Sequence, residues 1–146
     1  MNKGFELEAN AYLVKGCSVI AGVSYNDMKY TEAAEDVKDR RPATASSPWL
    51  VNFNASYQFL DGRMKGLGLG IGGNYASDNK IVNSTSMGTF ILPKYLVMNV
   101  NTYYEARKFK IGFKIDNFTN EQYWNGYTTA NAQPLANAVG SFTYKF

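Results

Sequence analysis

Polar and apolar residues alternate along most of this chain with a period of two, and this pattern restricts its fold more than any other feature. Successive side chains of a strand point to opposite faces, whereas a helix repeats every 3.6 residues. The cleanest run extends from Trp49 to Leu60. We predict an all-β chain with seven strands, at about Lys3–Val14, Cys17–Tyr30, Trp49–Leu60, Gly66–Ala76, Lys94–Ala106, Phe109–Asn117 and Asn137–Phe146.

The predicted strands are long, and the connections between them alternate strictly in length. Strands of about 9 to 14 residues exceed the five or six usual in soluble proteins and match the ~9–11 tilted residues that cross a bilayer. The short connections are Lys15–Gly16, Asp61–Lys65 and Ala106–Lys108. The long ones are Thr31–Pro48, Ser77–Pro93 and Phe118–Ala136. Alternation of this kind is typical of an antiparallel up-and-down transmembrane barrel, with short periplasmic turns and long extracellular loops.

Aromatic residues make up 15% of the chain and gather at both ends of the predicted strands. Those at the long-loop ends are Tyr25, Tyr30, Trp49, Tyr75 and Tyr95. Those at the short-turn ends are Tyr57, Phe59, Tyr104, Phe109, Tyr144 and Phe146. Two such belts indicate two membrane interfaces. The apolar face is therefore predicted to point away from the barrel axis at Val51, Phe53, Ala55, Leu67, Leu69, Ile71, Ile111 and Phe113.

The composition excludes several classes of function. The chain has no His and one Cys, Cys17, which excludes Ser-His-Asp triads, His-based metal sites and an intrachain disulfide. The net charge of +3 comes without a clustered basic patch, so a nucleic-acid partner is not expected. We therefore predict no catalytic residues, no metal site, no cofactor and no enzymatic activity.

Two motifs on the polar faces favour a barrel lumen over a chemical site. Glu6 and Glu8 are neighbours on one face, and nothing catalytic accompanies them. Gly68, Gly70 and Gly72 share one face of a predicted strand, but no helix follows them as a phosphate-binding loop requires. These glycines either leave room for an element inside the barrel or allow the strand to bend.

Several segments resemble TonB-dependent outer-membrane receptors, and their order is most similar to the siderophore-receptor branch. Asp116–Trp124 is similar to the N-L-T-[ND]-x-x-Y-W stretch near the end of these receptors. Pro42–Phe59, Gly66–Tyr75 and Leu92–Tyr95 are similar to further pieces of the same family. The alternating aromatics Phe142, Tyr144 and Phe146 resemble the signal read by the barrel assembly machinery.

The resemblance implies that residues 1–146 are the C-terminal part of one 22-stranded outer-membrane barrel domain, without its plug domain and TonB-binding box. It implies TonB-energised uptake of a scarce ligand, expected to be a ferric siderophore, across the outer membrane of a Gram-negative bacterium. The implied partners are membrane lipid or lipopolysaccharide, the ligand, the plug, TonB and the assembly machinery.

The resemblance also makes the aromatics of the long loops candidates for ligand contact, because planar chelating groups stack on aromatic rings. The candidates are Phe90, Trp124 and Tyr127. For Tyr123 and Trp124, packing in the outer aromatic belt is the favoured alternative. Two other classes of protein stay open at this point: a stand-alone eight-stranded barrel with an adhesive or structural role, and a soluble lipocalin-like binding barrel.

Overall fold

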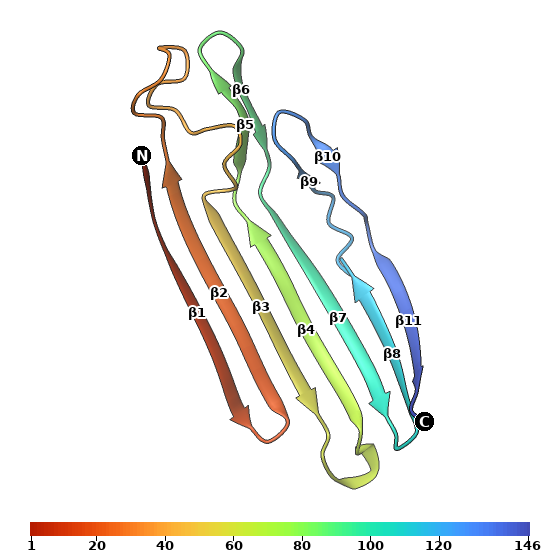
Figure 1. Ribbon diagram of the computed structural model, residues 1–146. Coiled ribbons are helices and arrows are strands. Elements are labelled where there is room, and N and C mark those ends of the chain that lie inside the picture. Colours follow the sequence, from red (N-terminus) through yellow and green to blue (C-terminus); the bar gives the residue numbers. More distant parts are fainter.

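The computed structural model describes residues 1–146 and contains one antiparallel sheet with two small hairpins at one end (Figure 1). The order in the sheet is β1-β2-β3-β4-β7-β8-β11. These strands are Asn2–Val14, Cys17–Met28, Trp49–Gln58, Leu67–Ala76, Tyr95–Glu105, Phe109–Asp116 and Asn137–Tyr144. One 3-10 turn, η1 (Gly62–Met64), lies between β3 and β4. No helix is long and apolar enough to span a membrane.

All seven predicted strands are present, and their ends lie within two residues of the predicted ones. β2 ends at Met28 rather than Tyr30, because the N–H of Tyr30 donates to the carbonyl of Arg40 in the following loop at 3.0 Å. The all-β antiparallel prediction is confirmed.

The two hairpins lie inside the long loops, where no strands are predicted. The first pairs β5 (Asn79–Ser84) with β6 (Gly88–Leu92), and the second pairs β9 (Trp124–Asn125) with β10 (Asn131–Ala132). The register of the first hairpin shifts between Lys80 and Val82, which interrupts the alternation of side chains. The second has strands of two residues, too short to show a period.

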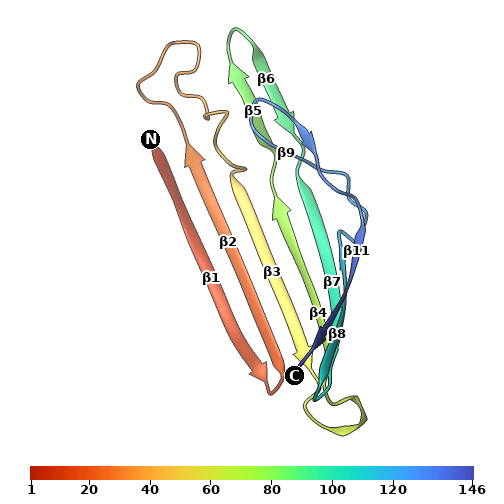
Figure 2. The same cartoon turned by 45° about the vertical axis from the view of Figure 1, so that its right-hand side comes forward.

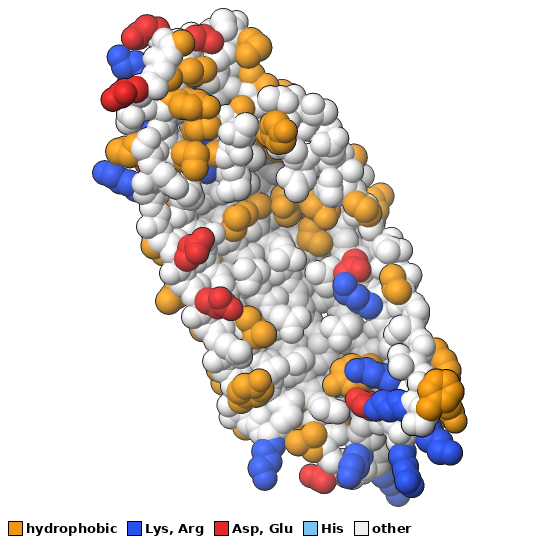
Figure 3. Space-filling model, in the orientation of Figure 1, with side chains coloured by type: hydrophobic (Ala, Val, Ile, Leu, Met, Phe, Trp, Pro, Cys, Tyr) orange, Lys and Arg blue, Asp and Glu red, His pale blue; other side chains and the backbone are white.

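The short turns all lie at one end of the sheet and the long loops at the other, as predicted (Figure 1). Figure 2 shows that β8 and β11 bend forward, so the sheet curves around the face seen in Figure 3. That face is largely uncharged, with acidic and basic side chains toward its margins (Figure 3). In register it carries a group of asparagines: Asn52, Asn54, Asn74, Asn99 and Asn101.

The apolar face does not enclose a core. Four of the residues predicted to point outward are exposed by 41 to 50% (Leu69, Ile71, Ile111 and Phe113), and the other four are half-buried. The buried hydrophobic residues all lie at or near the long-loop end instead: Ala45, Ala76, Ile81, Leu92 and Val97. A soluble barrel would gather its apolar face into a shared interior, so this structure disfavours that alternative. The sheet is open and has seven strands, with β1 and β11 at its edges, so it is not a closed eight-stranded barrel.

Aromatic contacts mark both ends of the apolar face. At the long-loop end the rings of Phe5, Tyr25 and Trp49 lie side by side, with Tyr25 and Trp49 centroids 4.7 Å apart. At the short-turn end the contacting pairs are Tyr57–Phe59, Tyr104–Phe109, Phe109–Phe142 and Tyr144–Phe146. This arrangement agrees with two interfacial belts.

The glycines of β4 make room for side chains of the neighbouring strands. A Cβ atom on Gly68 would lie 2.2 Å from the ring of Tyr103, and one on Gly70 would lie 2.6 Å from the amide of Asn101. Both partners are the register neighbours of these glycines on β7. The sequence left open whether these glycines make room for an element inside the barrel or allow the strand to bend. At these two positions the side chains of Tyr103 and Asn101 on the neighbouring strand occupy the space.

Candidate functional site

The loop between β2 and β3 is fastened onto the β5–β6 hairpin through the carboxylate of Asp36. Its Oδ1 accepts the N–H of Ser86 at 2.7 Å, and its Oδ2 accepts the hydroxyl of Ser86 at 3.0 Å. The hydroxyl of Thr85 also donates to Oδ1, and the N–H of Thr85 donates to the Asp36 carbonyl at 3.0 Å. These bonds, the Thr85 hydroxyl first, hold the pKa of Asp36 below its ordinary value.

Two arginines complete the same contact. Arg41 donates from Nη1 to the carbonyl of Asn26 at 2.7 Å and from Nη2 to the carbonyl of Ser46 at 2.6 Å. Partial burial lowers the pKa of Arg41. Arg40 donates to Oδ1 of Asn83 at 3.3 Å, and the amide of Asn83 donates to the Arg41 carbonyl at 3.1 Å. The loop and the hairpin therefore form one layer above the sheet.

Asn117 and Asn120 shape the loop between β8 and β11. Asn117 is 3% exposed and has a φ of +52°, a left-handed conformation that Asn tolerates better than most residues. Its amide donates to the carbonyls of Glu121 at 2.8 Å and Pro134 at 3.2 Å, and its Oδ1 accepts the N–H of Glu121 at 2.9 Å. Oδ1 of Asn120 accepts the N–H of Ala136 at 3.1 Å. These bonds join the two ends of the loop.

The three long loops meet around a cavity of about 210 Å³ at the end of the sheet. The N–H of Thr128 donates to the carbonyl of Ile81 at 3.2 Å, which connects the last loop to the β5–β6 hairpin. The lining mixes hydroxyl, amide and aromatic groups and comprises Ser46, Ser47, Leu50, Ala76, Ser77, Asn79, Leu92, Pro93, Tyr95, Trp124 and Asn125. Asn79 is 8% exposed, and its Oδ1 is buried without a hydrogen-bond partner. The cavity therefore combines hydroxyl and amide residues with the aromatic rings of Tyr95 and Trp124.

Of the three candidate ligand residues, the structure places only Trp124 in this cavity. Phe90 on β6 is 53% exposed, Tyr127 is 63% exposed, and neither lines the cavity. Tyr123 instead packs on Tyr95, with ring centroids 4.6 Å apart. Tyr95 belongs to the predicted aromatic belt at the long-loop end, so this contact is the packing that the sequence analysis favours for Tyr123.

Sequence reasoning missed Asn79 and Asn125 as cavity residues. They lie in different loops, some 45 residues apart, and neither belongs to a motif or a periodic pattern. Only their meeting around one cavity sets them apart from the many other asparagines of the loops.

The three residues of the predicted assembly signal lie on or just beyond the last strand. Phe142 and Tyr144 are on β11, exposed by 68% and 49%, and Phe146 follows the end of the strand and is fully exposed. Phe142 stacks on Phe109 at 6.4 Å, and Tyr144 contacts Phe146 edge to face at 5.4 Å. The three aromatics thus form an accessible row.

Known proteins similar to this chain are outer-membrane receptors. Residues 1–118 match the family described as "TonB dependent receptor-like, beta-barrel". The ferrichrome outer membrane transporter/phage receptor of Escherichia coli K12 is 33% identical over 97 residues, which are 65% of this chain and 13% of that protein. The chain thus spans about an eighth of the length of this relative.

Solved structures of similar fold cover nearly the whole chain. The ferripyoverdine receptor of Pseudomonas aeruginosa aligns with a TM-score of 0.78 and 20% identity, over 97% of this chain and 19% of that one. The FrpB iron transporter of Neisseria meningitidis aligns with a TM-score of 0.74 and 17% identity, over 99% of this chain and 24% of that one. At these identities the matches establish the fold, that of a receptor barrel wall.

The family match and the barrel fold decide between the classes left open by the sequence. TonB-dependent receptors are transporters of the Gram-negative outer membrane and not enzymes. The open, curved sheet, its exposed apolar face and its alternating connections agree with a stretch of such a barrel. This chain belongs to the TonB-dependent receptor family, as part of the outer-membrane β-barrel.

Proposed function

We propose that the chain forms the C-terminal wall of a receptor barrel that takes up a ferric siderophore across the outer membrane with energy from TonB. The cavity that joins the three long loops carries this proposal, because it combines the Trp124 ring with hydroxyl and amide groups at the outer mouth of the barrel. The relatives support it: one carries ferrichrome in its name, and another is a ferripyoverdine receptor.

The rest of the receptor is part of the same proposal. Residues 1–146 supply seven strands of a 22-stranded barrel, and the parent chain supplies the other strands, the plug and the segment that binds TonB. The polar concave face would then look toward the plug, and the apolar face would contact membrane lipid. Phe142, Tyr144 and Phe146 would be read by the barrel assembly machinery.

Lipopolysaccharide contact at the loop end has weaker support. The mixed-sign run in the loop after β2 contains Lys38, Arg40 and Arg41, the cations that would hold lipid phosphates. Lys38 pairs with Glu35 at 3.3 Å, and both arginines donate hydrogen bonds within the loop layer. Each of the three cations is therefore already engaged in at least one contact with the protein itself.

The ligand would use the three candidate aromatics at different depths. Trp124 lines the cavity, where its ring would stack on a planar chelating group among the hydroxyl and amide residues of the lining. Phe90 and Tyr127 are exposed and would meet the ligand as it enters.

Substitution of Trp124 by Ala in the complete receptor tests the proposal. Binding of a panel of ferric siderophores is measured by titration, and we expect the affinity for the cognate ligand to fall about two- to tenfold, since an aromatic contact contributes ~0.5–1.5 kcal/mol. Trp49→Ala is the matched control, because Trp49 lies in the outer aromatic belt with Phe5 and Tyr25. Equal affinity of W124A and wild type for every ferric siderophore would contradict the assignment of this residue.

A further inference from the structure

We propose that the outer face near the short turns binds an anionic glycerophospholipid, with an acyl chain in an apolar groove and the phosphate at the basic turns. The proposal rests on the membrane orientation given above, with the short turns on the periplasmic side. It concerns the end of the sheet opposite the cavity of the long loops, and nothing in the ligand-binding proposal requires it.

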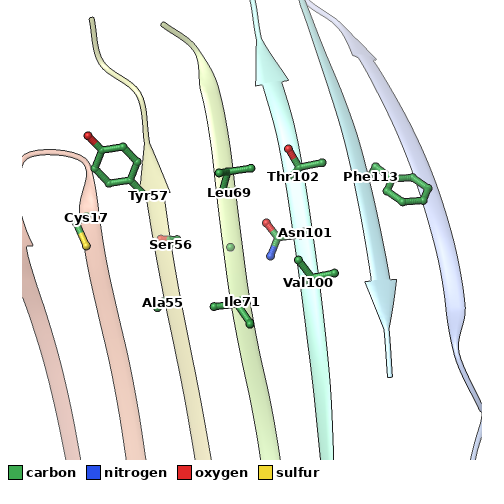
Figure 4. A pocket seen from close by; sticks show the side chains of 11 residues that line it. Cys17, Ala55, Ser56, Tyr57, Leu69, Ile71, Val100, Asn101, Thr102 and Phe113 are labelled. Carbon is green, nitrogen blue, oxygen red and sulfur yellow. The ribbon is translucent and has the colours of Figure 1, made fainter. Parts of the chain in front are cut away.

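The groove has a volume of about 410 Å³ and crosses β3, β4, β7 and β8 (Figure 4). Its apolar lining consists mainly of Ala55, Tyr57, Leu69, Ile71, Val100 and Phe113. Ala55 pairs with Ile71 in the register, and its small side chain leaves a depression between larger neighbouring side chains. The Thr102 hydroxyl donates to the carbonyl of Gly68 at 3.1 Å, so its polar atom is already satisfied. The groove therefore suits a hydrocarbon chain.

Basic side chains gather at the turns next to this groove. Lys15, Arg63, Lys65, Arg107 and Lys108 are all exposed and take part in no ion pair. The three turns contain a single acidic residue, Asp61. Figure 3 shows basic side chains projecting from this end of the molecule. At the opposite end the charges are largely matched, as in the pairs Lys29–Asp27 and Lys38–Glu35.

The distance between groove and charges fits one lipid molecule. Leu69 is the third residue of β4, about 7 Å from the first residue of the strand at ~3.3 Å per residue. The apolar band of an outer-membrane barrel is ~25 Å tall and its strands tilt by about 35–45°, so Leu69 lies in the half of the band beside the short turns. The groove therefore lies at the depth of the acyl chains of that leaflet. A phosphate at the membrane surface would then meet the turn cations. Charge complementarity thus selects an anionic headgroup for the chain in the groove.

The test is lipid binding to the complete, delipidated receptor in mild detergent, followed by native mass spectrometry. Phosphatidylglycerol, phosphatidylcholine, lipid A and inorganic phosphate are the probes. We expect phosphatidylglycerol to bind at least fivefold more tightly than phosphatidylcholine, and inorganic phosphate at the same concentration not to displace it. Joint substitution of Arg63, Lys65, Arg107 and Lys108 by Gln removes the preference, whereas the control K38Q/K80Q at the loop end keeps it.

Ala55→Trp fills the groove and should weaken retention of phosphatidylglycerol about fivefold. Ala9→Trp is its control, because Ala9 is also on the apolar face but does not line the groove. If A55W does not assemble, the joint substitution of the turn cations still tests whether binding prefers phosphatidylglycerol to phosphatidylcholine. Equal binding of the two phospholipids, stronger binding of lipid A, or displacement by inorganic phosphate alone would overturn the proposal. None of these outcomes bears on siderophore binding, which the Trp124 experiment reads separately.

Discussion

Single polar residues hold the long loops in place, and Asn117 shows how one side chain does so. Its backbone conformation is one that β-branched residues avoid, and its amide group satisfies backbone groups from both ends of the last loop. The same residue belongs to the segment that resembles the family motif. The motif therefore has a structural reason: it turns the chain out of β8 and closes the loop that carries Trp124.

Asn117→Ala should loosen this loop. The variant loses three hydrogen bonds of a buried amide and keeps a left-handed backbone that Ala disfavours, so we expect a loss of roughly 2–3 kcal/mol in the free energy of unfolding. Urea unfolding measures the loss in stability, and hydrogen exchange of residues 118–136 measures the loosening of the loop. Asn137→Ala, whose side chain forms no hydrogen bond, is the control and should change neither. Unchanged exchange in N117A would show that the loop is held by other contacts.

Asp36 gives the loop layer a dependence on pH. Its pKa is lower in the folded protein than in the unfolded chain, because Thr85 and Ser86 donate to the carboxylate. The resulting stability is present above the unfolded pKa, near pH 4, and is lost as the pH falls through the folded pKa. We expect the protection of the Thr85 and Ser86 amides from hydrogen exchange, relative to their intrinsic rates, to stay high from neutral pH to about pH 4 and to fall below it.

Asp36→Asn is the corresponding variant, since it cannot titrate. The fall in protection below pH 4 should be absent in D36N, and the loop of this variant should be less protected than that of wild type at neutral pH. Glu32→Gln, in the same loop and with no hydrogen bond to its side chain, is the control, and its loop should lose protection in acid as the wild-type loop does. The same acid response in D36N and wild type would assign the effect to another group.

At the scale of the strand, the sheet depends on matching small residues to large neighbours. Gly68 and Gly70 lie beside Tyr103 and Asn101 on β7, whose side chains lie flat over the glycine backbone. The alternation of glycines along β4 is thus the complement of the alternation of polar side chains along β7.

Gly68→Ala should destabilise the sheet by about 1–3 kcal/mol, because the new Cβ meets the Tyr103 ring and forces it to move. Tyr103→Ala in the same chain should relieve this clash, so the double variant should lose less than the sum of the single ones. Gly140→Ala on β11 is the control, since nothing lies within 4 Å of its Cβ position. Urea unfolding of the complete receptor measures all four. If the losses of stability of the two single variants add up in the double variant, the Tyr103 ring is not what prevents a side chain at position 68.

At the scale of the whole molecule, the outward apolar face and the aromatic end of β11 are features of a protein that is inserted into a membrane. Phe146 follows the last strand and is fully exposed, so it contributes little to the folded state. Under the proposal that Phe142, Tyr144 and Phe146 are read by the assembly machinery, Phe146 acts during assembly and not through packing in the folded state.

Deletion of Phe146 in the complete receptor should therefore reduce the amount of receptor assembled in the outer membrane. Heat-modifiable mobility and surface labelling measure assembly, and Tyr144→Ala should show a milder defect, since it shares the face of Phe146 two residues back. Phe5→Ala, at the opposite belt, should assemble normally. Assembly of the deletion variant at the wild-type level would contradict the signal.

The sequence by itself determined the seven strands, their faces, the position of the two aromatic belts and the end at which the long loops lie. It could do so because side-chain alternation is a local property: each strand displays its two faces within a few residues, and short connections force antiparallel neighbours.

The tertiary structure alone decided how the loops are built. Asp36 meets Ser86 across 50 residues, and Trp124 shares a cavity with Asn79, while Phe90 and Tyr127 stay outside it. Such contacts depend on hydrogen bonds and packing between loop segments that are far apart in the sequence. These segments have no periodic pattern of side chains, so the local sequence does not predict their contacts. The sequence likewise showed that the glycines of β4 share one face. Only the register with β7 showed that Tyr103 and Asn101 fill the space beside Gly68 and Gly70.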